Sequence, residues 1–287
     1  MKVCYIQDLS PFTELGGAQQ TDKAHILYGI KQGHEIEIML PTSPSDLTQW
    51  ADMVVISNAS SFPIKLFEEL QKPYVFFIHD YWPLCKYRLF YSMLDKCKDC
   101  SSRKGWLPVF LKSKLNIWLS PMHRKSWLFA YPELRNRPFH LSPSPVNPEL
   151  FFDMELERSG VLAIHSHLEY KGRVRFLEYA EEHKDTQITL VGANPNDPTL
   201  PSNVTAIQFV PPYDMNALYN RHEVFLHLPT TPQPFERTIA ESWFAGCKVI
   251  GNKNIGALEW IQNKEQFKSL LKDSSENFWK VIEGTLK

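Results

Sequence analysis

The sequence predicts an α/β protein built from two parallel sheets, each covered by helices on both faces. Two observations carry this expectation. Short apolar runs alternate with stretches of helical periodicity along nearly the whole chain, and a proline-rich segment interrupts the alternation near the middle of the 287 residues. Alternation of this kind favours parallel sheets that bind ligands at the carboxyl ends of their strands.

In the first half, the expected strands are short runs rich in apolar residues and bounded by polar or turn-forming residues. They are Lys2–Gln7, Glu35–Leu40, Met53–Ser57, Tyr74–His79, Asn116–Ser120 and Pro138–Ser142. Helices are expected at Ala18–Gln32 and Ile64–Gln71, between these strands.

The second half repeats the pattern. Its expected strands are Gly160–His165, Gln187–Val191, Val204–Phe209, Val224–His227 and Lys248–Gly251. Its expected helices are Gly172–His183, Met215–Tyr219 and Arg237–Ala245.

The domain boundary is expected in Ser142–Pro148, because three prolines in this stretch exclude regular structure and suit a hinge. The chain then divides into an N-terminal domain, residues 1–145, and a C-terminal domain, residues 146–273. Two Rossmann-like domains facing across a cleft follow from this boundary. Residues 274–287 form a separate amphipathic helix, with Phe278, Trp279 and Ile282 on its apolar face.

Composition indicates a soluble globular protein. Apolar residues make up 43% of the chain, and 8 Trp and 18 Phe suffice to fill two cores. Since no run of about 18 apolar residues occurs, and Met1–Ile6 predicts a first strand and no signal sequence, a cytoplasmic location is expected. The 5 Cys are too sparse for a disulfide framework, which agrees with a reducing compartment.

The stretch from Gln233 to Gly251 carries the most functional information. Ile239, Ala240, Trp243 and Phe244 recur at helical spacing, and a strand follows the helix. Glu241 therefore projects from this helix near its start. The alternative interpretation is an amphipathic helix with one solvated Glu.

This loop, helix and strand resemble the donor-site signature of retaining family-four glycosyltransferases with the GT-B fold, typically Glu-x-Phe-Gly, four residues, then Glu. The residues that fall in register are Pro234, Phe235, Arg237, Thr238, Glu241, Ala245 and Gly246. Gln233 stands where the family has its first Glu, and Glu236 stands where a Gly is usual.

Other sites match the same family in the same order. Gly16 and Gly17 resemble its Gly-Gly-Ala-Glu loop, where backbone amides approach an anion at a helix start; an ordinary turn is the alternative. His79 follows a strand in a His-Asp motif, and the resemblance implies that it hydrogen-bonds a hydroxyl of the donor sugar, with Asp80 as a second candidate. A structural His at a strand end is the alternative.

The segment Val161–Gly172 resembles the family's strand, Gly-Arg turn and Lys-Gly helix start. Lys171 keeps its place and is expected to meet a diphosphate oxygen, whereas the family's Arg falls on Ser166. Arg173, Arg175 or Arg237 could replace that missing cation. Further on, Gly256 and Glu259 align with the loop that closes over the donor.

The resemblance implies an enzyme that binds a nucleoside-diphosphate sugar, expected to be a UDP-sugar, and transfers a hexosyl or pentosyl group with retention of configuration. Lys171 and helix ends would meet the charge of the leaving group, Glu241 would hold the ribose hydroxyls, and Gln233 would take the place of the sugar-binding Glu. No metal is required. The departures at Gln233 and Ser166 imply either a different donor sugar or a catalytically silent GT-B-like binding subunit.

Cys85, Cys97 and Cys100 form a short cluster with one Cys-x-x-Cys pair, a spacing that would suit zinc with a nearby His as fourth ligand. Free thiols are the alternative, because a second pair is absent.

Charge is distributed unevenly along the chain. The segment Lys86–Arg137 holds twelve Lys or Arg and three Asp or Glu, interleaved with aromatic residues, in a chain of net charge -1. Such a segment suits an anionic acceptor. The expected acceptor is a lipid-linked or other saccharide, with peripheral membrane contact; a hydroxylated base in DNA is the alternative. The interpretation without a functional role is that these residues are ordinary exposed charges and core aromatics.

Overall fold

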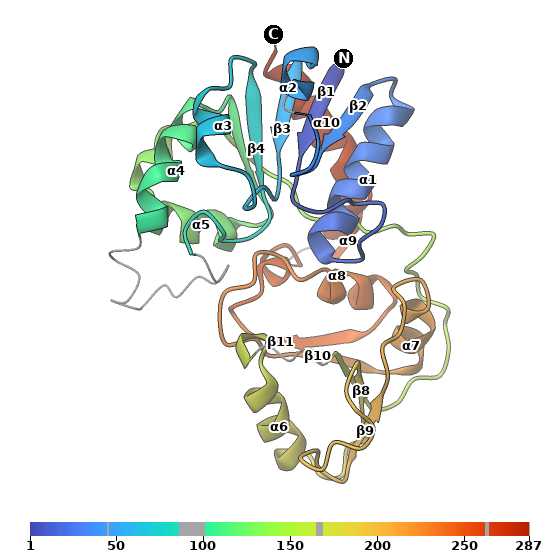
Figure 1. Cartoon of the computed structure of the whole chain (residues 1–287). Helices are drawn as coiled ribbons and strands as arrows, with labels where there is room; N and C mark the ends of the chain where they lie inside the picture. Colours follow the sequence, from blue (N-terminus) through green and yellow to red (C-terminus); the bar gives the residue numbers. More distant parts are fainter. Residues whose placement is uncertain (45, 86–100, 165–168, 262–263, 287) are drawn as a thin grey trace. The chain divides into compact units, whose positions relative to one another are not determined.

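The computed structural model of the chain describes residues 1–44, 46–85, 101–164, 169–261 and 264–286. The chain forms two compact units. Unit 1 comprises Met1–Pro145 together with Ser269–Lys287, and unit 2 comprises Val146–Lys268. Each unit is an α/β layer structure with its own parallel sheet (Figure 1).

Unit 1 contains a six-stranded parallel sheet in the order β2-β1-β3-β4-β5-β6. Its strands are β1 (Lys2–Ile6), β2 (Glu35–Met39), β3 (Met53–Ile56), β4 (Tyr74–Ile78), β5 (Leu115–Trp118) and β6 (Phe139–Leu141). Its helices are α1 (Gly17–Lys31), α2 (Leu47–Trp50), α3 (Ile64–Glu68), α4 (Ser101–Lys112), α5 (Pro121–Ala130), η2 (Pro132–Asn136) and α10 (Ser274–Gly284).

The strands of unit 1 bury both of their faces, which explains why they are continuous apolar runs and not alternating ones. Every residue of β3 and β4 is buried. On one face the ring centroid of Phe76 lies 4.2 Å from that of Phe110 in α4, and the centroid of Phe110 lies 4.8 Å from that of Trp127 in α5. On the other face Phe77 contacts Phe278 of α10 at 5.0 Å between ring centroids.

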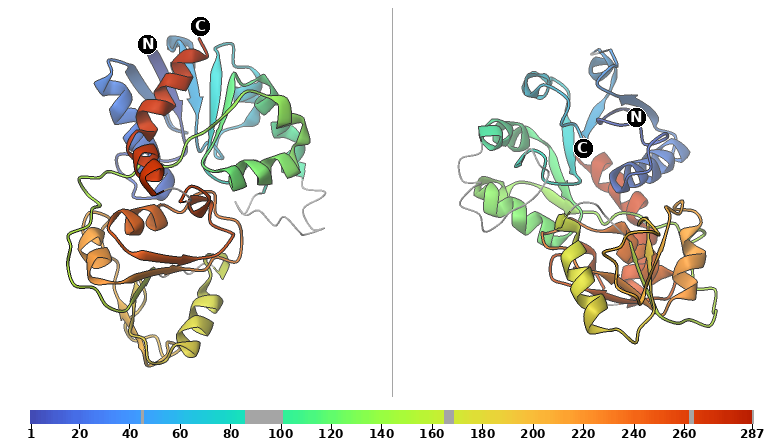
Figure 2. Two further views of the ribbon diagram at one scale, coloured as in Figure 1. Left: turned by 180° about the vertical axis from the view of Figure 1, so that it is seen from behind. Right: turned by 60° about the horizontal axis from the view of Figure 1, so that its bottom comes forward.

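Helix α10 packs along α1 in unit 1, although the whole of unit 2 separates the two helices in the sequence (Figure 2). Phe278 stacks on His25 of α1 with the ring centroids 4.0 Å apart, and the indole of Trp279 donates to the carbonyl of His25 at 2.7 Å. Gly29 makes this approach possible, because a Cβ there would lie 2.5 and 2.6 Å from ring atoms of Trp279. The contact between α1 and α10 therefore needs a glycine at position 29.

Unit 2 contains a five-stranded parallel sheet in the order β11-β10-β7-β8-β9. Its strands are β7 (Val161–Ile164), β8 (Ile188–Val191), β9 (Val204–Ile207), β10 (Val224–His227) and β11 (Lys248–Gly251). Its helices are η3 (Glu169–Lys171), α6 (Arg173–Glu182), α7 (Met215–Arg221), α8 (Arg237–Phe244), η4 (Gly256–Glu259) and α9 (Lys264–Lys272), the last of which continues into unit 1.

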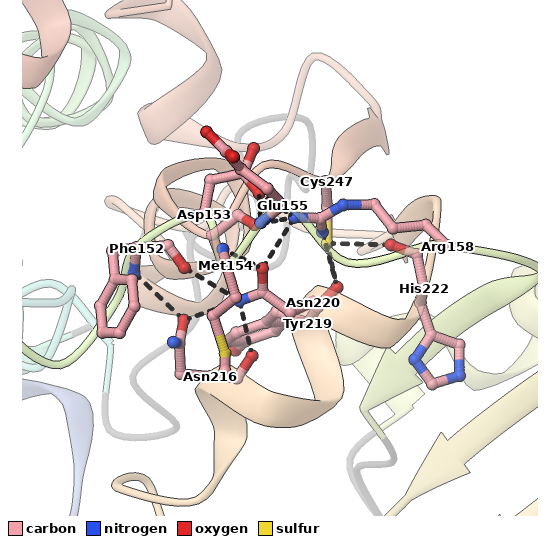
Figure 3. A network of polar contacts seen from close by, with 11 residues as sticks. Phe152, Asp153, Met154, Glu155, Arg158, Asn216, Tyr219, Asn220, His222 and Cys247 are labelled. Atoms are coloured by element: carbon pink, nitrogen blue, oxygen red, sulfur yellow. Dashed lines mark hydrogen bonds and ion pairs between the residues drawn. The ribbon is translucent and has the colours of Figure 1, made fainter.

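A polar network fixes the first residues of unit 2 to helices α7 and α8 (Figure 3). Asn220 of α7 accepts from the amide of Met154 at 2.7 Å and donates to the carbonyl of Phe152 at 2.9 Å. The guanidinium of Arg158 donates to the carbonyl of Tyr219 at 3.1 Å and to that of Ala245 at 2.7 Å. Because these carbonyls lie at the carboxyl ends of α7 and α8, one cation meets the negative ends of two helix dipoles.

The structure confirms the α/β class predicted from the sequence, and each of the eleven strands in the described ranges overlaps a predicted one. Some elements end two or three residues from the predicted position: α3 ends at Glu68 and not at Gln71, β5 at Trp118 and not at Ser120, β9 at Ile207 and not at Phe209, and α7 at Arg221 and not at Tyr219. Helices α2, α4, α5 and α9 were not predicted. Pro108 lies inside α4, where a proline argues against a helix. Helix α5 has favourable start signals that the sequence analysis did not use, a capping Ser120 followed by Pro121 at the first helical position.

We expect Gly29→Ala to lower the free energy of unfolding by about 1–3 kcal/mol, because the added methyl group forces Trp279 from its packed position. Chemical denaturation followed by tryptophan fluorescence measures this. Gly284→Ala at the end of α10 is the matched control, since a Cβ there meets no atom within 4 Å. Equal stability of Gly29→Ala and the wild type would contradict the proposed close packing.

Candidate functional site

The carboxyl ends of β7 and β10 lie side by side in the sheet of unit 2, the edge at which parallel sheets bind ligands. A pocket opens at this edge against the start of α6. Its lining residues are Ala163, Ile164, Lys171, Gly172, Arg173, Phe176, Leu190, Leu226, His227 and Leu228. The lining combines an apolar base with the cationic or polar groups of Lys171, Arg173 and His227.

Gly172 fixes the position of Lys171 in this pocket. Its φ is +99°, in the left-handed region that favours glycine, and a Cβ at this position would collide with the carbonyl oxygen of Leu228 just after β10. The chain therefore passes from η3 into α6 in direct contact with the end of β10. The glycine of the Lys-Gly pair singled out in the sequence is therefore a steric requirement of this turn.

The loop before α8 is held by a second loop that follows β11. Gln233 and Ile255 form a parallel bridge, and the amide of Gln233 donates to the carbonyl of Asn254 at 2.6 Å. The amide of Ala257 donates to the carbonyl of Phe235 at 2.9 Å. These backbone bonds give the start of α8 a defined position at the edge of the sheet.

Glu236 occupies the residue immediately before α8 and connects three elements. One oxygen of its carboxylate pairs with the ammonium of Lys171, and the other lies 2.9 Å from Nε2 of His227 at the end of β10. Burial raises the pKa of Glu236, but the charges of Lys171 and His227 and their hydrogen bonds lower it further, so that the pKa lies well below its usual range. The carboxylate is ionised at neutral pH.

Glu236 also has an unusual backbone conformation. Its φ is +70°, and Glu155 is the other non-glycine residue with a positive φ in the described part of the chain. A left-handed conformation costs an L-residue about 1–2 kcal/mol relative to the helical or extended regions. A glycine would relieve this strain, so a Glu at this position indicates a role for its side chain.

Arg237 and Glu241 form an ion pair one turn further along α8, with 3.1 Å between Nη2 and Oε1. Glu241 is buried. Burial raises its pKa, although the Arg237 guanidinium opposes this shift. Thr238 lies half-buried between them in the first turn. The ion pair with Glu236 brings Lys171 to the start of α8, the end of the helix at which Arg237, Thr238 and Glu241 lie.

The side chain of Gln233 has a different environment from the one expected. It is buried, and its Nε2 donates to the carbonyl of Thr231 at 3.0 Å and to the hydroxyl of Thr231 at 3.2 Å. Its amide group is therefore bound within its own loop.

The arginines that were considered as replacements for the missing cation all have protein partners. Arg173 pairs with Asp197 at 2.8 Å, and Arg175 donates to the carbonyl of Pro229 at 3.2 Å. Arg237 pairs with Glu241. Ser166, which stands at the family's Arg position, lies outside the described residues.

In unit 1, His79 follows β4 and is bound to a carboxyl group that the sequence analysis did not identify. Nε2 of His79 lies 2.9 Å from Oδ1 of Asp22 in α1. Asp22 has no solvent exposure and also accepts from the hydroxyl groups of Tyr5 at 3.0 Å and Ser57 at 2.7 Å. Three donors on β1 and after β3 and β4 thus converge on one carboxyl group, which orients the imidazole of His79.

The other predicted site residues of unit 1 are two glycines, an aspartate and three cysteines. Gly16 precedes α1 and Gly17 is its first residue, so these glycines lie at a helix start as expected. Oδ1 of Asp80 accepts from the amide of Trp82 at 2.7 Å, and Cys85 is buried with a free thiol. Cys97 and Cys100 lie outside the described residues. Within the described ranges, no group of three or more His, Cys, Asp or Glu is arranged to hold a metal ion.

Neither family models nor curated proteins match the sequence. Solved structures do match. Sucrose-phosphate synthase from Thermosynechococcus elongatus superposes with a TM-score of 0.76 at 12% identity, over 99% of both chains. HepE of Anabaena in complex with UDP and glucose superposes with a TM-score of 0.61 at 15% identity, over 96% of this chain and 94% of that one. An alpha-glucosyltransferase in complex with UDP gives 0.61 at 11% identity, over 100% of both chains.

The chain has the GT-B fold. This likeness confirms the fold class predicted from the sequence, with its two Rossmann-like domains and a final helix returning to the first of them. The described helices include none that combines the length and apolar character needed to cross a membrane.

Sequence reasoning missed Glu236 as the partner of Lys171, His227 as a second partner of Glu236, and Asp22 as the partner of His79. Signals for them existed. Glu236 replaces the glycine of the resembled motif. His227 is a polar residue at the end of a buried strand, and Asp22 lies on the same helical face as the apolar Ile26.

We expect Asp22→Asn to lower the free energy of unfolding by about 1–3 kcal/mol, since the amide nitrogen would face a donor and leave it without an acceptor. Ser57→Ala is the matched control, because it removes one donor and leaves the carboxyl group bonded to two others. Urea denaturation gives both values, and 15N chemical shifts of the His79 ring report the loss of its partner. A larger cost for Ser57→Ala than for Asp22→Asn would contradict the central role of Asp22.

Proposed function

We propose that this chain is a glycosyltransferase that moves a sugar from a nucleoside-diphosphate sugar, a UDP-sugar, to an acceptor hydroxyl with retention of configuration. The observation that carries the proposal is the convergence of Lys171, Glu236 and the Arg237–Glu241 pair at the start of α8, on the ligand-binding edge of a parallel sheet. Solved structures of the same fold contain UDP or UDP-glucose, which supports this choice of donor.

A nucleoside diphosphate leaves only if its developing negative charge meets positive charge. Lys171 is the cation proposed for this role. It retains two N–H donors besides the one that binds Glu236, and the starts of α6 and α8 add their amide dipoles. The diphosphate would thus bind between two helix starts of unit 2.

Glu241 is assigned to the ribose hydroxyls. A carboxylate accepts two hydroxyl donors, and Arg237 favours the ionised form of this buried group. In unit 1, His79 would donate or accept a hydrogen bond with a sugar hydroxyl, while Asp22 holds the ring. Retention would follow from attack on the face that the leaving group departs from, without an enzyme nucleophile and without a metal.

The two domains would bind different substrates. We assign residues 1–145 to the acceptor and residues 146–273 to the donor, with residues 274–287 as the returning helix. The departures from the family pattern at Gln233 and Ser166 favour an altered donor preference, such as a pentose or another compact sugar. Gly16 and Gly17 would present the amides of the α1 start to an anion.

We expect Lys171→Ala and Glu241→Ala each to lower kcat/KM for a UDP-sugar by about 10- to 100-fold, because each variant loses one or more charge-assisted hydrogen bonds to the donor. Steady-state release of UDP measures this. Lys184→Ala is the matched control, because Lys184 is exposed and forms only a surface pair with Glu181 at 3.3 Å. Full turnover in both variants would overturn the site assignment. Stabilisation of the wild type by UDP without any turnover would instead favour a catalytically silent binding subunit.

The acceptor is proposed to be anionic, because three arginines of unit 1 have no acidic partner among the described residues. Arg124, Arg135 and Arg137 form no ion pair with any described residue. Burial, and then the charge of Arg135, lowers the pKa of Arg124, which stacks 3.7 Å over the ring of Phe139. Two like charges close together without a counter-ion favour the binding of an external anion.

A nucleic acid is a second candidate acceptor beside a lipid-linked saccharide. The same arginines favour it, and one structure of similar fold is an alpha-glucosyltransferase in complex with UDP-glucose and DNA, at a TM-score of 0.59 and 12% identity over 96% of this chain and 90% of that one. A hydroxylated base would then be the group that is glycosylated. Either acceptor would bring the protein to an anionic surface.

We expect the double variant Lys125→Gln, Arg135→Gln to weaken binding to duplex DNA and to reduce the slope of log K against log salt by up to about two, one for each phosphate that is no longer neutralised. Both side chains are exposed, so folding should be unaffected. Lys184→Gln with Lys268→Gln in unit 2 is the control. Flotation of the wild type with phosphatidylserine vesicles, together with no salt-dependent retention on DNA, would exclude the nucleic-acid acceptor.

A further inference from the structure

The loop before α8 has its carboxylate three residues later than the resembled pattern, at Glu236 and not at position 233. The side-chain amide of Gln233 is bound to Thr231 within the loop. Three residues later an ionised carboxylate pairs with Lys171 and lies 2.9 Å from Nε2 of His227. Both of these partners line the pocket at the carboxyl end of the sheet.

We propose that Glu236 is the residue that binds hydroxyl groups of the donor sugar in this chain, in place of Gln233. The inference rests on the proposed function, since it names a sugar ligand for the same site. It adds a specificity-determining carboxylate at a position where a glycine was expected.

The carboxylate has the capacity for this contact. Two carboxylate oxygens offer about four acceptor directions, and Lys171 and His227 occupy one direction on each oxygen. Its side chain remains 16% exposed, more than the 10% of Glu241. The free directions can accept two hydroxyl donors, and a carboxylate has no donor of its own to compete with them.

The contacts also fix the geometry that sugar recognition needs. Lys171 and His227 hold the two oxygens from different elements, so the plane of the carboxylate is defined before a ligand arrives. The same ammonium that would bind the diphosphate binds Glu236. A sugar attached to that diphosphate would therefore lie within reach of this carboxylate.

An internal clamp is the competing interpretation of these contacts. It explains the two ion pairs, but a clamp between Lys171 and His227 does not need a residue in the left-handed region of the backbone. The two interpretations differ in one measurable property. A clamp affects stability alone, whereas a sugar contact affects UDP-sugar binding relative to UDP binding.

The test compares Kd values for UDP and for UDP-glucose, UDP-galactose, UDP-N-acetylglucosamine and UDP-xylose, measured by titration calorimetry on the full chain. With the sugar nucleotide that the wild type binds most tightly, Glu236→Gln and Glu236→Gly should each raise the ratio of its Kd to the Kd of UDP by about tenfold. The Kd of UDP itself should stay constant or fall, because a negative charge beside Lys171 is removed.

Lys184→Ala is the control and should leave this ratio unchanged within about twofold, because Lys184 is an exposed residue of unit 2. Gln233→Met tests the competing assignment, in which the amide that binds Thr231 would contact the sugar instead. Thermal unfolding of each variant shows whether it is folded. An unchanged ratio in folded Glu236 variants, or a shift in Gln233→Met instead, would overturn the assignment of Glu236. Failure of the wild type to bind UDP and every sugar nucleotide would overturn the proposed function and this inference together, which is a separate result.

Discussion

The candidate site depends on one ionised carboxylate. Glu236 binds Lys171 before α6 and His227 at the end of β10, while its own backbone begins α8. Three elements therefore meet at one charged group. A buried carboxylate is stable only with such partners, so the position of the cation, the strand end and the helix start are mutually dependent. Any ligand of this site must bind a cation that already has a counter-ion.

The sequence predicted the strands well because parallel strands buried on both faces are dense apolar runs, as in β3 and β4. It predicted the helices less well where local signals conflict with tertiary packing. Trp106 and Phe110 stabilise α4 through their contacts with Phe76, in spite of Pro108. The stabilisation from such tertiary contacts outweighs the low intrinsic helix propensity of the segment, but the contacts cannot be predicted from the sequence of that segment alone.

The candidate site was predictable to the level of elements but not of side-chain directions. Lys171 and Glu241 were assigned to the starts of two different helices and to one donor nucleotide. The ion pair of Lys171 with Glu236 brings Lys171 to the start of α8, where Arg237 pairs with Glu241. The amide of Gln233, however, binds Thr231 in its own loop, and Glu236 was identified only as a departure from a glycine. Which polar group faces a ligand is decided by backbone pairing between two distant loops, seen in the bridge from Gln233 to Ile255.

The packing of α10 on α1 has a consequence for the order of folding. Residues of α10 that complete unit 1 are synthesised after all of unit 2. During translation, therefore, the second lobe can close its core while the first still exposes the groove around Gly29 and His25 that later receives Trp279 and Phe278. The nascent first lobe stays open, with an apolar surface that chaperones recognise, until the ribosome has made the last helix.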